Sequence, residues 1–175
     1  MPESNKRLKT KAQIEQALVS LLQHQNFDQI STSELARAAG VSRSSFYTHY
    51  KDKYDVIDHY QEKLSYQLEQ TFKEFAPNQR KMIIHIFHLL RNEPLFAALL
   101  SENGTHEIHF FLRHKLHHIL AQDLQQRQKS LSDTERDYRT VFLTHAFFGA
   151  CQTWTSRNFK ETPEEVADFL IKLLN

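Results

Sequence analysis

The stretch ELARAAGVSRSSFYTHYKDK, residues 34–53, is the part of the sequence that decides the fold. In a helix-turn-helix, two short helices cross at a sharp turn. The first helix needs a small residue at the contact, and the turn needs a residue that tolerates a left-handed backbone. Ala36 and Gly40 have this spacing. Apolar residues that can pack the two helices against a preceding helix are Leu35, Ala39, Val41 and Phe46.

The second helix of this unit is predicted to expose a polar face. Ser42 is suited to cap its first turn, and the N-terminus of a helix attracts anions such as phosphate. The other exposed side chains are donors and acceptors of the kind that contact base edges and phosphates: Arg43, Ser44, Ser45, Tyr47, Thr48 and His49. An amphipathic hairpin with a solvated face has a similar pattern, so this face alone does not establish DNA binding.

Composition describes a globular protein. The 175 residues are 40% hydrophobic, include thirteen phenylalanines and carry a net charge of +1. Residues 1–53 hold eight Lys/Arg and five Asp/Glu, so the N-terminal third is basic, which fits either a nucleic-acid partner or a solvated face.

The sequence also bears on the location of the protein. The single cysteine excludes an intrachain disulfide, and no apolar run approaches the roughly 20 residues of a membrane span. The basic N-terminus lacks the apolar segment of a secretory signal. We therefore expect a cytoplasmic location.

The sequence predicts an all-α fold, because glycine and proline are scarce and strand-like alternation is missing. Ser31 with Glu34, Ser132 with Glu135, and Thr162 with Glu165 have the spacing of capping boxes, and Pro163 falls at a first helical position. Breaks are predicted at Pro77–Asn78, Asn92–Pro94 and Asn103–Gly104. Nine helices result: about 10–25, 31–40, one capped by Ser42, 53–75, 79–91, 94–102, 106–129, one from about 133 and one from about 163.

The longer run ISTSELARAAGVSRSSFYTHYKDKYDVI, residues 30–57, resembles the DNA-binding signature of the TetR/AcrR family of bacterial transcriptional regulators. The resemblance implies a three-helix DNA-binding domain over residues 1–53, joined through a fourth helix to a regulatory and dimerisation domain over 54–175. It also implies that Tyr50 is a buried aromatic. Phosphate contacts are implied for Thr10, Tyr47, His49 and Lys53. Base contacts are expected from Arg43, Ser44 and Thr48. Ser42, which caps the helix, is also expected in the DNA-binding site.

The C-terminal part resembles a subgroup of this family. The segments DYRTVFLTHAFFGACQTWTSRNF (137–159) and TPEEVADFLIKLL (162–174) are similar to the C-terminal domain of a subgroup that includes the dihydroxyacetone-kinase regulators of Gram-positive bacteria. In the family, the last two long helices pair with their copies in a homodimer. The residues expected in that interface are Phe142, Phe148, Gly149, Trp154, Phe169 and Leu173, although packing inside the subunit is the alternative for each.

An apolar or aromatic effector is expected to bind among the regulatory helices. The proposed lining is Phe72, Phe87, Phe96, Phe110, Phe111 and Phe147, whereas phenylalanines at helical spacing commonly fill a core instead. Histidine pairs such as His85 with His88 lie at helical spacing, but no complete metal-ligand set accompanies them, so no metal and no cofactor are predicted. No catalytic motif is found, which argues against an enzyme.

Two functions follow from these patterns. The first is a dimeric DNA-binding repressor that recognises an inverted-repeat operator and is released by an effector. The second is a helical protein-interaction module whose helix-turn-helix does not bind DNA. Binding to duplex DNA that weakens steeply with salt distinguishes the first from the second.

Overall fold

The computed structural model describes residues 5–75 and 78–174, and within these residues the chain is helical with no strand. It confirms the predicted all-α fold. One 3-10 helix, η1 (Phe27–Gln29), accompanies the α-helices. The α-helices are α1 (Asn5–Leu22), α2 (Thr32–Ala38), α3 (Arg43–His49), α4 (Lys53–Phe75), α5 (Gln79–Asn92), α6 (Pro94–Leu100), α7 (His106–Arg127), α8 (Asp133–Ser156) and α9 (Pro163–Leu174).

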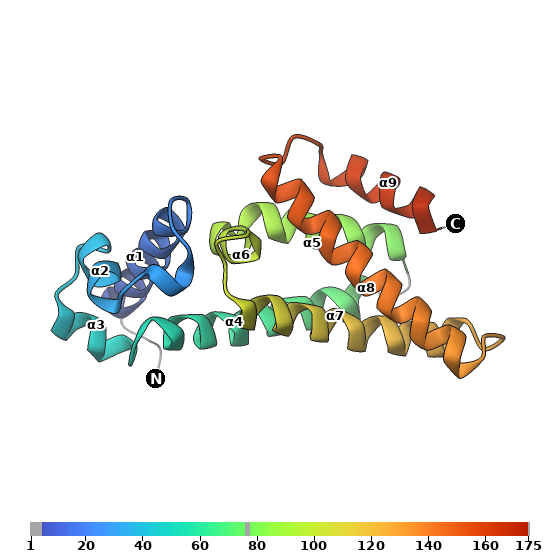
Figure 1. Ribbon diagram of the computed structural model, residues 1–175, viewed down its shortest axis with the longest axis horizontal. Coiled ribbons are helices and arrows are strands. Elements are labelled where there is room, and N and C mark those ends of the chain that lie inside the picture. The colour runs from blue at the N-terminus through green and yellow to red at the C-terminus, as the bar shows by residue number, and fades with distance from the viewer. Residues whose placement is uncertain (1–4, 76–77, 175) are drawn as a thin grey trace.

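The helices form two connected groups (Figure 1). Helices α1–α3 gather at one end of the molecule, and α4 runs from that end along the base of the second group, which α5–α9 complete. Buried apolar side chains form one continuous core from Ile14 in α1 to Ala167 in α9. The predicted boundary between residues 53 and 54 therefore falls inside the first turn of a helix that both groups share.

Helix boundaries differ most from the prediction in α1, which begins at Asn5 rather than near Thr10 and ends at Leu22 rather than Gln25. The predicted break at Asn26 and Phe27 is found, but it contains η1, which Asn26 caps by accepting a hydrogen bond from the N–H of Asp28 at 3.1 Å. Helices α6 and α7 each end two residues before the predicted position. The predicted break at Pro77 lies outside the described residues.

Side-chain caps start the helices where the sequence predicts them. Ser132 and Glu135 form a complete capping box, and so do Thr162 and Glu165. Ser31 accepts the N–H of Glu34 at 3.1 Å, but the carboxylate of Glu34 accepts from Gln25 instead of returning to the Ser31 N–H. The first of the three predicted boxes is thus half formed.

The helix-turn-helix has the predicted geometry. Gly40 has a φ of +66°, the left-handed conformation that glycine adopts without strain. Phe46 and Tyr50 are buried, and their rings lie 5.9 Å apart, so both belong to the core of this unit. The polar face of α3 is left to the solvent.

A tight turn between α6 and α7 joins the two helix groups. The Asn103 side-chain amide donates to the carbonyl of Leu22 at 2.8 Å, and the Asn103 carbonyl accepts the N–H of Phe27 at 2.9 Å. A Cβ at Gly104 would lie 1.8 Å from the carbonyl oxygen of Leu99, so the turn closes only around glycine. These contacts tie the end of α1 to the regulatory helices.

Among residues 5–75 and 78–174, no single helix has both the length and the apolar character needed to cross a membrane. Helices α5 and α6 pass that test only as a pair, and they meet at a bend of 96°.

Gly104→Ala is expected to lower the free energy of unfolding by about 3 kcal/mol, because the new methyl group overlaps the Leu99 carbonyl and the turn must open. Gly149→Ala is the matched control: its Cβ meets nothing within 4 Å, and replacing a helical glycine is worth up to about 1 kcal/mol of added stability. Chemical denaturation of both variants measures the difference. Equal stabilities would contradict the tight turn.

Candidate functional site

The candidate nucleic-acid interface is the exposed face of α3. The Ser42 hydroxyl accepts the N–H of Ser45 at 3.0 Å and so caps the helix. Arg43 and Ser44 are exposed directly after this cap, and Tyr47 is 51% exposed one turn later. A cation, a hydroxyl and a phenol that point to solvent from one short helix can bind phosphates and base edges.

Two further predicted residues of α3 are less free to contact DNA. Thr48 is exposed, but its hydroxyl donates to the Ser44 carbonyl at 3.0 Å, which leaves its oxygen available as an acceptor. His49 is half-buried at the end of the helix.

Lys53 was predicted to bind phosphate, yet its ammonium lies inside the protein. Nζ donates to the carbonyls of Phe27 at 2.8 Å and Asp28 at 3.0 Å, and it lies 4.7 Å from the centre of the Phe27 ring. Burial lowers the pKa of the ammonium, with opposition from the carboxylates of Asp28 and Asp52. In this conformation Lys53 holds η1 against the start of α4 and is not available to phosphate.

Thr10 is also placed differently from the prediction. Helix α1 begins at Asn5, so Thr10 lies more than one turn after its start. Thr10 is buried, and its hydroxyl donates to the Lys6 carbonyl at 3.1 Å. The additional N-terminal turn of α1 exposes Lys6, Arg7 and Lys9 instead. The signal for these cations is the run KRLKTK, residues 6–11, which adds to the basic character of residues 1–53 but whose lysines and arginine were given no individual DNA contact.

Lys51 is a cation that the prediction missed. Its side chain is exposed between α3 and α4, while its backbone N–H donates to the Asp55 carboxylate at 2.8 Å. Asp52 caps α4 by accepting the N–H groups of Tyr54 and Asp55. Of the two lysines in the Lys-Asp-Lys sequence, the exposed one is thus the first.

A small apolar cavity of about 50 Å³ lies among α4–α8. Three of the predicted effector residues line it: Phe72, Phe96 and Phe147. Phe148, predicted for the dimer interface, lines the same cavity, as does Cys151, whose burial raises its pKa to about 12.

The other predicted effector residues lie outside this cavity. Phe87 is fully buried behind it, with its ring 5.8 Å from that of Phe147. Phe110 is 67% exposed on α7 and stacks on His114. Phe111 lines a separate surface hollow beside Asp58 and Tyr66. Consecutive residues of a helix face directions about 100° apart, and on α7 this turn leaves Phe110 in solvent and Phe111 at the separate hollow.

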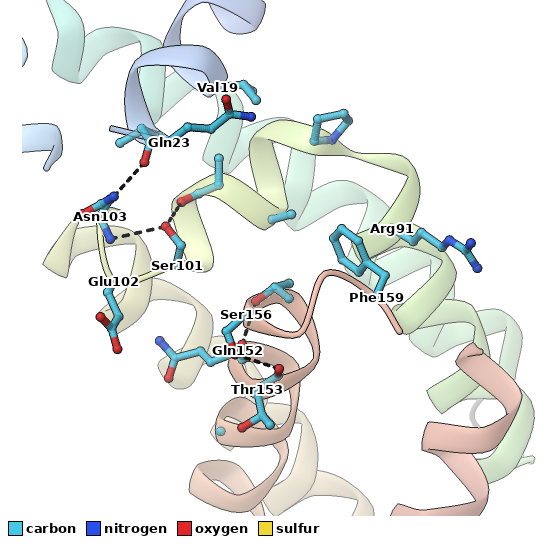
Figure 2. A pocket seen from close by; sticks show the side chains of 16 residues that line it. Val19, Gln23, Arg91, Ser101, Glu102, Asn103, Gln152, Thr153, Ser156 and Phe159 are labelled. Atoms are coloured by element: carbon cyan, nitrogen blue, oxygen red, sulfur yellow. Dashed lines mark hydrogen bonds between the residues drawn. The ribbon is translucent and has the colours of Figure 1, made fainter. Parts of the chain in front are cut away.

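A wider groove of about 700 Å³ lies between α1, α6 and α8 (Figure 2). Its wall contains the junction described above, with Asn103 directed towards α1 and Ser101 beside it. Arg91 and Phe159 mark the opposite side in the same view. The side chains that line it are mixed in character, and its two charged groups, Arg91 and Glu102, do not converge on one point in Figure 2.

The predicted dimer residues divide into exposed and buried sets. Phe142, Phe169 and Leu173 are exposed on α8 and α9, together with Tyr138 and Val141. Gly149 lies in the middle of α8 with nothing of its own chain near a Cβ placed there.

Trp154 belongs to the protomer's own core. It is 2% exposed, its Nε1 donates to the Glu161 carbonyl at 2.9 Å, and its ring contacts those of Phe87 and Phe159. A dimer interface therefore does not need its side chain, and the same holds for the buried Phe148.

Histidine side chains do not assemble into a metal centre: among the residues that the structure describes, no group of three or more His, Cys, Asp or Glu side chains could hold an ion. His88 faces Glu164 at 3.4 Å, and His109 lies 3.0 Å from the Leu99 carbonyl, so these two rings have protein partners.

Comparison with known proteins identifies the two halves separately. The profile described as "Bacterial regulatory proteins, tetR family" matches residues 14–60, and the profile "Transcriptional regulator C-terminal region" matches residues 77–175. The uncharacterized HTH-type transcriptional regulator YxbF of Bacillus subtilis strain 168 is 25% identical over 186 residues. That alignment covers all of this chain but 46% of the relative, so the chain spans about half its length.

Solved structures share the fold. A TetR transcriptional regulator from Streptococcus agalactiae 2603V is 23% identical with a TM-score of 0.70, over 97% of this chain and 96% of that one. The regulator FadR from Bacillus subtilis, in complex with stearoyl-CoA, is 20% identical with a TM-score of 0.61, over 93% and 96%. The dihydroxyacetone kinase operon activator DhaS is a weaker neighbour, 16% identical with a TM-score of 0.62 over 94% and 93%, so the predicted subgroup has only distant support.

The profile matches support a regulator rather than an enzyme. They cover the helix-turn-helix and the C-terminal helices that line the cavity, in the order in which the chain carries them. This chain belongs to the tetR family of bacterial transcriptional regulators.

Proposed function

We propose that this protein is a dimeric repressor that binds an inverted-repeat operator through α3 and is released when an effector binds among its regulatory helices. The observation that carries the proposal is the position of α3: a capped helix with an exposed cation and exposed hydroxyls lies at the end of the molecule, on a helix-turn-helix that buries Leu35, Ala39 and Phe46.

Arg43, Ser44 and Thr48 are the proposed base-reading residues, with Tyr47 and His49 on the phosphates. Arg43 is the one side chain of α3 that is long enough and charged for bidentate contact with a guanine. The others are short hydroxyls or partly buried, so shape and water contribute to the proposed recognition. Lys51, rather than the interior Lys53, is proposed as the phosphate contact at the start of α4.

Homodimerisation is proposed through α8 and α9. Tyr138, Val141 and Phe142 recur along one side of α8 and are exposed in the protomer, while Phe169 and Leu173 are exposed on α9. Large exposed apolar side chains that gather on a helix are a common feature of protein–protein contacts, which supports this choice of helices. A two-fold dimer presents two copies of α3, which matches an operator with two half-sites.

The effector site is proposed at the cavity lined by Phe72, Phe96 and Phe147. Its walls include α4, whose first turn adjoins α3, and α6, whose C-terminal turn adjoins the Asn103 junction. A ligand that separates these helices shifts the position of the helix-turn-helix only if it binds one conformation of the protein more tightly than the other. The FadR structure in complex with stearoyl-CoA supports ligand binding in this fold.

Selection of bound fragments from random duplex DNA tests the function as a whole. An enriched inverted repeat, bound with an affinity that falls steeply with salt, supports the repressor. Enrichment of no sequence together with salt-insensitive binding favours the protein-interaction module.

Arg43→Ala is expected to reduce the preference for the selected operator over one altered at the contacted base by roughly 1–3 kcal/mol, because the bidentate contact is lost. Competition binding against operator variants measures the loss. Arg37→Ala, on α2, is the control and is expected to leave the preference unchanged. An unchanged preference in the Arg43 variant would contradict a base contact by Arg43.

Lys51→Gln and Lys53→Met are expected to act differently. The first removes an exposed cation and lowers the salt slope of DNA binding by about one, with little change in stability. The second removes charged hydrogen bonds to two carbonyls and lowers the free energy of unfolding by about 1–3 kcal/mol. Salt titrations and denaturation curves of both variants separate the roles. A salt slope that falls only for Lys53→Met would show that Lys53, and not Lys51, is the phosphate contact.

Phe142→Glu is expected to convert the dimer to a monomer, because it places a charge in the proposed α8 contact. Phe110→Glu is the matched control, since Phe142 is 65% exposed and Phe110 is 67% exposed in the protomer. Sedimentation velocity at micromolar concentration distinguishes the two. A monomeric unmodified protein, or dimers in both variants, would contradict the interface.

A further inference from the structure

The cavity among α4–α8 has a single charged residue in its wall. Of the described residues that line it, all are apolar except Lys115 of α7, which lies among Leu112, Leu116 and Ile119. A lysine in such a position packs its aliphatic stem on apolar neighbours and directs its ammonium outwards. The charge therefore marks one end of an otherwise apolar site.

A second space continues the cavity at this end. A groove of about 430 Å³ shares Phe72, Lys115 and Ile119 with the cavity, so the two meet at the lysine. The groove is open, and its lining combines apolar side chains such as Met82 and Leu120 with charged or polar groups, which include Lys73, His118, Glu69 and Asp123. An apolar interior that opens on a groove with charged groups suits a ligand with one apolar and one polar end.

The size of the inner cavity restricts the apolar end. Its volume of about 50 Å³ is well below the roughly 150 Å³ that accommodates benzene in an engineered cavity. The cavity is too small for a whole chain as well, but an aliphatic chain is narrower than a ring in cross-section, so it can enter end-on with a smaller displacement of side chains such as Phe72 and Phe147. The cavity thus favours a linear chain over the aromatic effector expected from the sequence.

The charge at the mouth restricts the polar end. The Lys115 ammonium donates to the Glu69 carboxylate, and this hydrogen bond is the main cause of a lowered pKa for Glu69. The Glu69 side chain is 46% exposed, and an ion pair with such exposure contributes little net stability because water solvates both partners. An incoming anion can replace Glu69 on Lys115 at small cost, whereas a cation would meet the ammonium.

We propose that this site binds an amphipathic anion: an unbranched aliphatic chain in the cavity, with a carboxylate or phosphate end that displaces Glu69 from Lys115. The proposal rests on the effector role given to the cavity above. It adds the chemical class of the effector and names Lys115 as the residue that selects it.

Isothermal titration calorimetry with four probes tests the class directly: octanoate, octanol, octylammonium and benzoate. We expect octanoate to bind about five-fold more tightly than octanol, octylammonium to bind most weakly, and benzoate to bind more weakly than octanoate. Equal affinities for octanoate and octanol, tighter binding of octylammonium or benzoate, or no binding of any probe would each overturn the proposal.

Variants at the mouth assign the selectivity to Lys115. Lys115→Met keeps an apolar stem and is expected to bring octanoate and octanol within about two-fold of each other, while Lys115→Arg keeps the preference. Glu69→Gln removes the competing carboxylate and is expected to tighten octanoate about two-fold or more without affecting octanol. Lys160→Met, an exposed lysine of the α8–α9 turn, is the matched control and should leave the preference intact. A preference that survives in Lys115→Met would remove Lys115 from the site.

Binding of the selected operator by the ligand-free protein is measured separately, so the two proposals can fail independently. Lys115-dependent binding of octanoate without operator binding contradicts the repressor and leaves the ligand class standing. Operator binding without selective octanoate binding contradicts the ligand class alone.

Discussion

The hydrogen bonds of Asn103 set the position of the DNA-binding helices relative to the rest of the molecule. One residue uses its side-chain amide on the last turn of α1 and its carbonyl on the first residue of η1. Gly104 makes this geometry possible, because any side chain there overlaps the Leu99 carbonyl. The direction in which α3 faces therefore depends on a turn that lies far along the chain, within the regulatory half.

Helix α4 provides the second connection, and Lys53 fixes its start. The buried ammonium holds the carbonyls of η1, so the end of α1, the 3-10 turn and the first turn of α4 form one unit. At the other side of the domain junction, Glu93 accepts hydrogen bonds from Lys63 and Gln67 of α4 at the bend between α5 and α6. Helix α4 is thus linked to the start of α6 through polar contacts as well as through packing, and the effector mechanism proposed above uses this link.

Local features could be predicted from the sequence, and long-range ones could not. The capping boxes at Ser132 and Thr162 depend on residues three positions apart, and the left-handed Gly40 depends on a single residue. Lys53, in contrast, finds its acceptors 25 and 26 residues away, which no local pattern reveals. Trp154 is buried because the α8–α9 turn, with positive φ at Asn158 and Phe159, folds back over its ring. A composition rich in phenylalanine indicated an apolar site, but only the helix packing separates Phe111 from Phe110 and both from the cavity.

The burial of Cys151 has a practical consequence for studying motion in this protein. With a pKa near 12, the thiol has almost no thiolate at neutral pH, and its position in the core keeps reagents away. It is the only cysteine in the sequence. A cysteine introduced on the exposed face of α3 would therefore be the only thiol that reacts with a spectroscopic label, and Cys151 need not be replaced. The separation of the two labels in a dimer would then report directly how far apart the reading helices stand with and without a ligand.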